Sequence, residues 1–282
     1  MSDEGSIGPR WEGPADPVSA WLGLALEEEP PAGDAPAVVV GRAPASPPLL
    51  LAGGRLAAGP LAALVDTVGG MTCGLALQPD WVVTSTLTLL VGPEPWPEGG
   101  TLVARGRLLH AGRRSAASQV LLGSPEAPEA SAVALISSAR VRVPTLAGGL
   151  TLANRPRPLR RPAPSPELGR PLAALADLAT SRERSEPVRV ELADTLRNPL
   201  GILHGGLTAV LADAAARRLA GPSWTVRRLS LRYLVPATTG PVRARAQVRP
   251  AGTGALTAQV EIVDEGHDAR QVATAQVTLA EP

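Results

Sequence analysis

Residues 198–213 read NPLGILHGGLTAVLAD and place an amide, a histidine, two adjacent glycines and a carboxylate in an otherwise apolar stretch. The Ala- and Leu-rich pattern that starts at the glycines, residues 205–219, predicts a helix. His204 and the two glycines stand where a loop becomes this helix, so free backbone N–H groups and the positive end of the helix dipole can face a ligand oxygen. Asp213 falls inside the apolar pattern, where a carboxylate is costly unless it is hydrogen-bonded or functional. The stretch predicts a polar site at the start of a helix.

Two long hairpins are predicted, one in each half of the chain. Residues 100–120 and 240–260 coincide without a gap at Gly, Ala, Arg, Ala, Gly, Gln and Val when the offset is 140. Each segment alternates apolar and polar residues, breaks at Ala-Gly and alternates again, which indicates a hairpin with its turn near Gly112 or Gly252. Further strands are predicted at residues 82–91, 132–143, 188–192, 226–235 and 271–279.

A second helix is predicted ahead of the first set of strands. Residues 59–77 read GPLAALVDTVGGMTCGLAL, and Pro60 suits the first turn of a helix. One helix followed by four strands, repeated once, indicates an α+β fold with an internal duplication. We expect a flexible leader at residues 1–20, an N-terminal domain at 21–144, a Pro- and Arg-rich linker at 145–170 and a C-terminal domain at 171–282.

The composition argues against several classes of protein. With 44% hydrophobic and 19% charged residues, the 282-residue chain has the balance of a globular protein of about two domains. A net charge of +1 does not create the overall positive potential that attracts nucleic acid, so a nucleic-acid partner is not expected. The single cysteine, Cys73, excludes an internal disulfide and any multi-cysteine metal site. Neither a signal peptide nor an apolar run of about 18 residues is visible, which predicts a cytoplasmic protein without a membrane partner.

The spacing of the polar residues carries a family resemblance. Asn198, then His-Gly-Gly and Asp213, are followed by an alternating strand that ends in Tyr233-Leu-x-Pro236. This series resembles the hotdog-fold acyl-CoA thioesterases of the phenylacetate-pathway (PaaI) type and covers nearly all of residues 171–282. The first half is similar in strand order and spacing but keeps only part of the motif. The whole chain therefore resembles a tandem, or double, hotdog.

The resemblance implies a fold and a reaction. Two helix-wrapped antiparallel sheets would join into one pseudo-dimeric sheet, and the protein would hydrolyse an acyl thioester to the free acid and CoA. The backbone N–H of Gly205 would hold the thioester carbonyl, while Asn198 and His204 would orient the pocket. Asp213 would act as the nucleophile or as the general base for water. Stabilisation of the oxyanion is usually the largest contribution in acyl transfer, and no metal or other cofactor is implied.

The family also implies that each pocket takes residues from both halves. A Ser or Thr about eighteen residues after the partner's Asp corresponds to Thr84, with Ser85 next to it. Gly206 and Ser85 would contact the substrate. The predicted catalytic set is Asn198, His204, Gly205, Asp213 and Thr84.

The first half has lost most of the motif. Ala57 stands where His204 would be, and Leu51 stands in place of Asn198. The strand residue that would complete this pocket comes from the second half, where Val226 stands in place of Thr84. The predicted degenerate second site consists of Asp66, Ala57 and Gly59. The sequence therefore predicts one active pocket with Asp66 outside it.

Two other functions and one other site remain open. The pair could be a non-catalytic acyl-CoA-binding or scaffolding protein, or an acyl hydratase. The acidic cluster at residues 264–267 could hold a metal, although a hairpin turn is the favoured interpretation. Because a double hotdog is already a pseudo-dimer, the chain could be a monomer or form a homo-oligomer.

Overall fold

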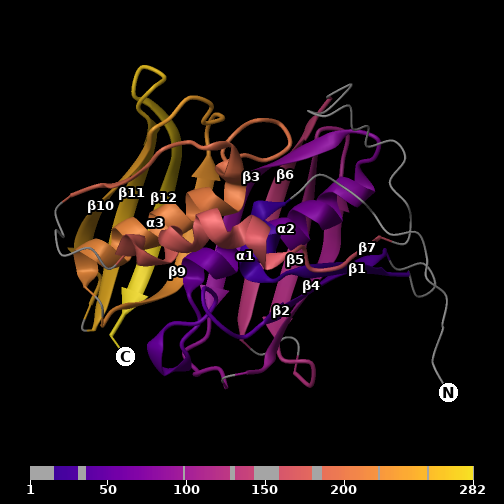
Figure 1. Ribbon diagram of the computed structural model, residues 1–282, viewed down its shortest axis with the longest axis horizontal. Helices are drawn as coiled ribbons and strands as arrows, with labels where there is room; N and C mark the ends of the chain where they lie inside the picture. Colours follow the sequence, from indigo (N-terminus) through magenta and orange to yellow (C-terminus); the bar gives the residue numbers. More distant parts are fainter. Residues whose placement is uncertain are drawn as a thin grey trace.

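The halves of the chain share one continuous antiparallel sheet. The computed structural model describes residues 16–30, 36–97, 99–127, 131–142, 159–179, 186–221, 223–252 and 254–281. Within these residues the sheet has 12 strands and curves around helices that lie across one of its faces (Figure 1).

The two halves join at a central pair of strands. β3 (Trp81–Val91) pairs antiparallel with β9 (Thr225–Tyr233), and the Thr88 and Ser230 hydroxyls lie 2.9 Å apart across the seam. From the seam, the first half continues through β6 (Ala132–Val141), β5 (Ser115–Gly123), β4 (Thr101–Ala111), β2 (Val38–Pro44), β1 (Ala25–Glu29) and β7 (Arg160–Arg161). The second half continues through β12 (Arg270–Ala280), β11 (Ala255–Asp264), β10 (Val242–Pro250) and β8 (Val188–Val190). The predicted edge-to-edge joining of two sheets is confirmed.

The two predicted hairpins pair in the same register as far as Leu108 of the first, where β4 has a bulge that β10 lacks. Gly106 of β4 faces Val120 of β5, and Ala246 of β10 faces Val260 of β11. These are the same pair 140 residues apart, which confirms the internal duplication. The alternation of apolar and polar residues arises because successive side chains of a strand point to opposite faces, and the apolar face contacts the helices.

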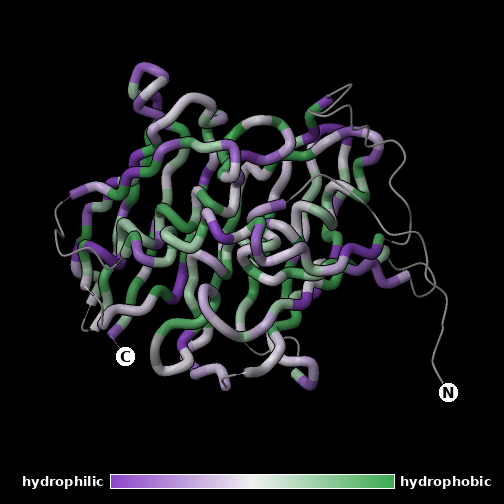
Figure 2. Tube along the Cα trace, viewed as in Figure 1, coloured by the Kyte–Doolittle hydropathy of each residue, from purple (hydrophilic) through white to green (hydrophobic). Residues whose placement is uncertain are grey.

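The central helices pack directly against each other. α2 (Ala58–Ala76) and α3 (Gly205–Ala220) match the predicted ranges closely. A Cβ atom on Gly206 would come within 2.5 Å of the Ala63 Cα, and one on Gly59 within 3.0 Å of the Val210 Cα. Glycine is therefore required at both positions, and the start of each helix lies beside the middle of the other. In Figure 2 the hydrophobic residues follow these helices and the strands behind them, whereas hydrophilic residues gather in the connecting loops.

The segments outside the predicted elements also belong to the fold. The predicted leader ends inside α1 (Pro17–Leu22), whose N-cap Asp16 accepts hydrogen bonds from two backbone N–H groups. Residues 143–158 of the predicted linker lie outside the described residues. Leu159 is fully buried and exchanges hydrogen bonds with Glu28, and the following β7 pairs with β1. The end of the predicted linker is thus an edge of the sheet rather than a solvated spacer.

The segment after β7 lies against helices of both halves. The 3-10 helical segment η2 (Pro166–Ala179) packs against both α1 and α3. Among the described helices none is long and apolar enough to span a lipid bilayer.

Candidate functional site

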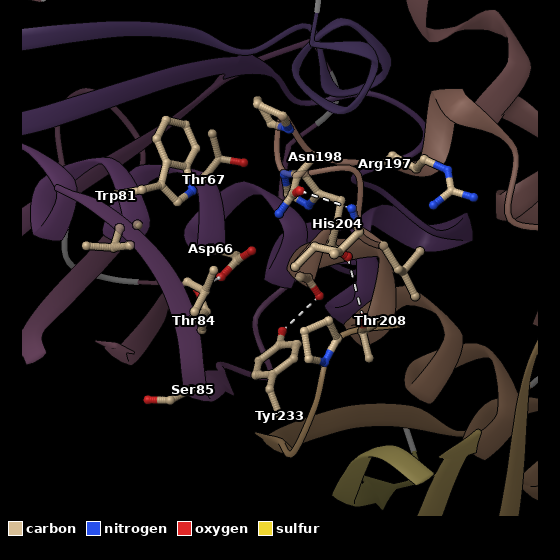
Figure 3. Close-up of a pocket in the computed structure, with 18 of the residues that line it drawn as sticks. Asp66, Thr67, Trp81, Thr84, Ser85, Arg197, Asn198, His204, Thr208 and Tyr233 are labelled. Atoms are coloured by element: carbon tan, nitrogen blue, oxygen red, sulfur yellow. Dashed lines mark hydrogen bonds between the residues drawn. The ribbon is translucent and has the colours of Figure 1, made fainter. Parts of the chain in front are cut away.

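A cavity of about 490 Å³ lies between the two halves. Its walls come from α2 and β3 of the first half and from residues 197–205 and the end of β9 in the second half (Figure 3). The cavity therefore forms where the start of α3 meets the middle of α2.

The start of α3 supplies two hydrogen-bond donors. His204 is the N-cap, and its ring Nδ1 accepts a hydrogen bond from the Gly206 N–H at 3.1 Å. Because Nδ1 is an acceptor, the proton of the neutral ring is on Nε2. The Gly205 N–H is the first of the helix, and no described residue accepts a hydrogen bond from it. An imidazole N–H and a backbone N–H are thus available to a ligand oxygen.

Asn198 fixes the loop that leads into α3. Its Oδ1 accepts hydrogen bonds from the backbone N–H groups of Leu200, at 2.9 Å, and Ile202, at 3.4 Å. The Arg197 guanidinium supports the same loop by donating to the Gly201 carbonyl at 2.6 Å. Within the described residues the Asn198 amide nitrogen has no partner, so it is a further donor beside His204.

Asp66 of α2 is the carboxylate of this cavity. Its side chain is 6% exposed, and its Oδ1 accepts a hydrogen bond of 2.7 Å from the Thr84 hydroxyl. Its Oδ2 lies only 2.9 Å from where a Cβ of Gly205 would be, so it touches the start of α3. Burial raises the pKa of Asp66 above its usual value, and this outweighs the lowering by His204, the Thr84 hydroxyl and the Gly206 N–H. Such a carboxylate accepts a proton more readily near neutral pH than an exposed one.

Tyr233, at the end of β9, holds the backbone next to these groups. Its hydroxyl donates to the Gly205 carbonyl at 2.8 Å. Burial, followed by the negative charge of Asp66, raises the pKa of Tyr233 well above its usual value, so the phenol stays a donor. The sequence showed Tyr233 only as part of the family motif and not as a site residue.

A partly buried ion pair lies at another wall of the cavity. The Arg161 guanidinium lies 3.1 Å from the Asp16 carboxylate, and both residues line the cavity. Burial raises the pKa of Asp16, but Arg161, His204 and the hydrogen bonds from Ser19 together hold it below its usual value. Neither residue carried a sequence signal, because the segment around Arg161 has no apolar period and Asp16 falls in the predicted leader.

Asp213 does not lie in this cavity. It lines a second, smaller cavity of about 160 Å³ together with Leu51 and Ala57. Its carboxylate is 1% exposed and forms an ion pair with Arg217, with Nε and Oδ2 3.0 Å apart. Oδ1 has no hydrogen-bond partner among the described residues. The prediction that grouped Asp213 with His204, and placed Asp66 in the degenerate site, is wrong about these positions.

The helix geometry explains the exchange of the two aspartates. Nine residues of α-helix rise about 13.5 Å, so Asp213 is carried away from His204 along their own helix. The start of α3 instead faces Asp66, and the start of α2 faces Asp213, whose Cβ lies 2.9 Å from where a Gly59 Cβ would be. Each pocket therefore combines the loop of one half with the aspartate of the other.

Of the two residues predicted to contact the substrate, Ser85 lines the larger cavity, whereas Gly206 packs against Ala63 and does not line it. Thr84 and Ser85 both line the larger cavity, although the Ser85 hydroxyl donates to the Ser137 carbonyl at 3.0 Å. Val226 is buried, and the hydroxyl of its neighbour Thr225 accepts a hydrogen bond from Arg55 at 2.7 Å.

The acidic cluster at residues 264–267 has a structural role. Asp264 accepts hydrogen bonds from the backbone N–H groups of Thr238, Thr239 and Gly240 at 2.8, 3.0 and 2.7 Å. Burial raises its pKa, but the three N–H groups and His267 outweigh this and hold the pKa below its usual value. No group of three His, Cys, Asp or Glu side chains that could hold a metal ion occurs in the described part of the chain.

Comparisons with known proteins agree with this architecture. Residues 194–280 match the family model described as "Acyl-CoA thioesterase N-terminal domain". Among curated proteins none matches the sequence. The predicted thioester hydrolase chemistry is confirmed by the family model, and the narrower PaaI subtype is not distinguished by it.

Solved structures with the same fold span most of the chain. A conserved protein with a hot dog fold from Alicyclobacillus acidocaldarius is 11% identical over 95% of this chain and 98% of its own, with a TM-score of 0.57. A tesB protein of Mycobacterium avium subsp. paratuberculosis is 15% identical over 94% and 98%, with a TM-score of 0.57. The 12:0-ACP thioesterase from Umbellularia californica is 11% identical over 87% and 94%, with a TM-score of 0.55. These similarities confirm the predicted double hotdog fold.

Proposed function

We propose that the protein is an acyl-CoA thioesterase with one active centre, in the cavity between its halves, and that Asp66 is the catalytic carboxylate. The observation that carries this proposal is the meeting of Asp66 and Thr84 from one half with His204 and Gly205 from the other. Because one chain supplies both sides of this centre, a monomer suffices for activity. A cytoplasmic location belongs to the same proposal.

The start of α3 stabilises the transition state. The thioester carbonyl oxygen accepts a hydrogen bond from the Gly205 N–H, which is left unpaired by the helix. The positive end of the helix dipole adds to this donor as negative charge develops on the oxygen. Electrostatic stabilisation of this kind is usually the largest contribution in acyl transfer.

Asp66 activates the attacking water. It takes a proton from water, and the water oxygen bonds to the thioester carbon, which gives a tetrahedral oxyanion held by Gly205. The C–S bond then breaks as the carbonyl re-forms, and the proton on Asp66 passes to the departing thiolate. The raised pKa of Asp66 suits both transfers, since a general base works best with a pKa near the working pH.

The neighbouring side chains orient these groups. Thr84 fixes the rotamer of the carboxylate through its hydrogen bond to Oδ1. His204, with its proton on Nε2, donates a hydrogen bond into the cavity and is not free to act as a base, because Nδ1 is used by Gly206. Tyr233 holds the carbonyl of Gly205 and hence the peptide plane at the helix start.

The test is hydrolysis of acyl-CoA substrates from acetyl to palmitoyl, with detection of the released thiol. We expect turnover in the wild type and its loss in Asp66→Asn. Tight acyl-CoA binding without thiol release would instead indicate a binding or scaffolding protein, and water addition to an enoyl-CoA without thiol release would indicate a hydratase. A single turnover in ¹⁸O water checks the role of Asp66: label in the product acid alone supports general-base catalysis, whereas label in Asp66 shows that it is the nucleophile.

A further inference from the structure

The larger cavity extends from Asp66 along α2. Thr67 and Trp81 lie on one side of Asp66, while Arg197 lies beyond His204 on the other (Figure 3). The α2 side is lined by Gly70, Met71 and Gly74 of the helix. We call this part of the cavity, between Asp66 and Trp81, the α2 arm.

The α2 arm is apolar. Val82 and Ala139 also line it. Apart from Asp66, the Asp and Arg side chains that line the whole cavity in the described part of the chain are paired: Asp80 with Arg140 at 3.2 Å, Asp16 with Arg161 at 3.1 Å and Arg197 with Asp194 at 3.4 Å. An acyl group with its own charge would therefore find no unpaired partner here, whereas a hydrocarbon or aromatic group would be removed from water.

Gly70 keeps the α2 arm open. No heavy atom lies within 4 Å of where its Cβ would be, so the absent side chain leaves empty space. Glycine inside a helix is unfavourable because it loses more conformational freedom than alanine on folding. No packing contact requires glycine at this position, in contrast to Gly206, where a Cβ would collide with Ala63.

The second half shows what a side chain at this position does. Gly70 follows Asp66 by four residues, and Arg217 follows Asp213 by four residues. The Arg217 guanidinium folds onto Asp213, and this pair lines the smaller cavity. The position four residues after the aspartate thus leaves open space in the larger cavity, whereas in the smaller cavity it holds a charged side chain.

We propose that the α2 arm binds the acyl group of the substrate, that this group is an uncharged apolar chain or ring, and that Gly70 determines how long it can be. This inference rests on the proposed function, because it takes a thioester as the ligand. The acyl carbon lies at Asp66 and the chain runs past Gly70 toward Trp81.

The test is equilibrium binding of two non-hydrolysable CoA thioethers, S-ethyl-CoA and S-octyl-CoA, to Gly70→Leu and to a matched control. The control is Ala76→Leu on the same helix, where the side chain is exposed and outside the cavity. Each buried methylene contributes about fourfold in affinity. If leucine displaces two or three of them, Gly70→Leu weakens S-octyl-CoA about 15- to 60-fold and leaves S-ethyl-CoA within about twofold. Ala76→Leu changes neither.

Binding separates this inference from the proposed function. If the thioethers show the expected length dependence but no acyl-CoA is hydrolysed, the acyl site stands and the proposed activity fails. If acyl-CoA is hydrolysed but Gly70→Leu weakens both thioethers equally, or neither, the acyl group does not lie in the α2 arm and the inference is overturned. Absence of wild-type binding to either thioether overturns it as well.

Discussion

The two helix starts of this protein have the same backbone and different side chains. The His204 N–H donates to the Leu196 carbonyl at 2.9 Å, and the Ala57 N–H donates to the Leu49 carbonyl at 2.8 Å, the same pair 147 residues apart. The His204 ring caps its helix, whereas no side chain caps the helix after Ala57. The loop shape thus persists without the polar residues, so it serves folding, and the polar residues of the second half serve another purpose.

The two aspartates differ in a similar way. Asp66 accepts a hydrogen bond from Thr84, and no arginine among the described residues forms an ion pair with it. Asp213 is neutralised by Arg217. A buried carboxylate without a cationic partner is costly and is characteristic of functional sites. The comparison supports the proposal that Asp66 serves catalysis, whereas Asp213 has a structural ion pair.

The largest expected effect is on turnover in the two Asp→Asn variants. Asp66→Asn removes the proposed base and should lower kcat by about 10³- to 10⁴-fold. Asp213→Asn should leave kcat per folded molecule within about threefold of the wild-type value, which corresponds to about 0.6 kcal/mol in the activation free energy. Acyl-CoA hydrolysis at matched folded fraction, measured by circular dichroism, gives both values. Equal losses in the two variants would mean that both pockets work and would remove the distinction drawn here.

A single substitution should make the larger cavity resemble the smaller one. Gly70→Arg places a guanidinium four residues after Asp66, where i,i+4 ion pairs form on a helix. Pairing lowers the pKa of the carboxylate and fills the α2 arm, so we expect kcat/KM to fall by about 100-fold or more, through lost base strength and blocked binding. Gly70→Ala is the matched control and should retain most activity toward short acyl-CoA. Full activity in Gly70→Arg would show that this position does not face the substrate.

Much of this fold follows from the sequence. Alternating polarity and the 140-residue offset identified both long hairpins, and the Ala- and Leu-rich runs identified both central helices. β1 and β7 were missed because both are short. β7 is the two-residue edge strand, and β1, next to it, reads ALEEE, whose glutamates resemble a solvated loop. The run VVV at the start of β2 is a strand signal that could have been used.

The candidate site was predicted in its residue types but not in its pairing. Asn198, His204, Gly205 and Thr84 line one cavity, but they share it with Asp66 and not with Asp213. The aspartate could not be assigned, because spacing along the chain fixes how far a residue lies along its own helix and not which neighbouring helix start it faces. That choice depends on the antiparallel packing of α2 against α3, which no local pattern encodes.

Replacing the two aspartates by asparagine should change the free energy of unfolding in opposite directions. Asp213→Asn leaves the Arg217 guanidinium without its partner and should lower the free energy of unfolding by about 1–3 kcal/mol. Asp66 has a raised pKa in the folded state, so its contribution to stability is present below its unfolded pKa and is lost as the pH rises through the folded pKa. Asp66→Asn should therefore be as stable as the wild type or more so at pH 7. Urea unfolding at pH 7 measures both, and a destabilised Asp66→Asn would contradict the assignment of roles.

Thr84→Val should shift the pH dependence of the reaction. The Thr84 hydroxyl favours the ionised form of Asp66, so its removal raises the pKa of that carboxylate further. The acidic limb of kcat/KM should move to higher pH, and kcat should fall about 10-fold through loss of positioning. Thr88→Val is the matched control on the same strand, because that hydroxyl pairs with Ser230 at the seam. An unchanged limb in Thr84→Val would show that its hydrogen bond does not act on the catalytic base.

The smallest expected effect is that of Tyr233→Phe. Tyr233 is polar and its counterpart on the strand of the other half is not, so the two strands differ in the same way as the two pockets. Thr88 and Ser230 face each other at the seam, so the counterpart of Tyr233, three residues past Ser230, is the buried Val91.

Tyr233→Phe removes the hydrogen bond to the Gly205 carbonyl and loosens the peptide plane that carries the proposed oxyanion donor. We expect kcat to fall about three- to tenfold, the scale of about 1 kcal/mol for one neutral hydrogen bond, with KM nearly unchanged because the bond does not touch bound substrate. Since the chain has a single tyrosine, alkaline absorbance titration of the wild type reports this phenol directly and should show ionisation well above the usual range. A rise in KM with constant kcat, or a phenol that titrates normally, would separate Tyr233 from the reaction and leave its hydrogen bond a purely structural one.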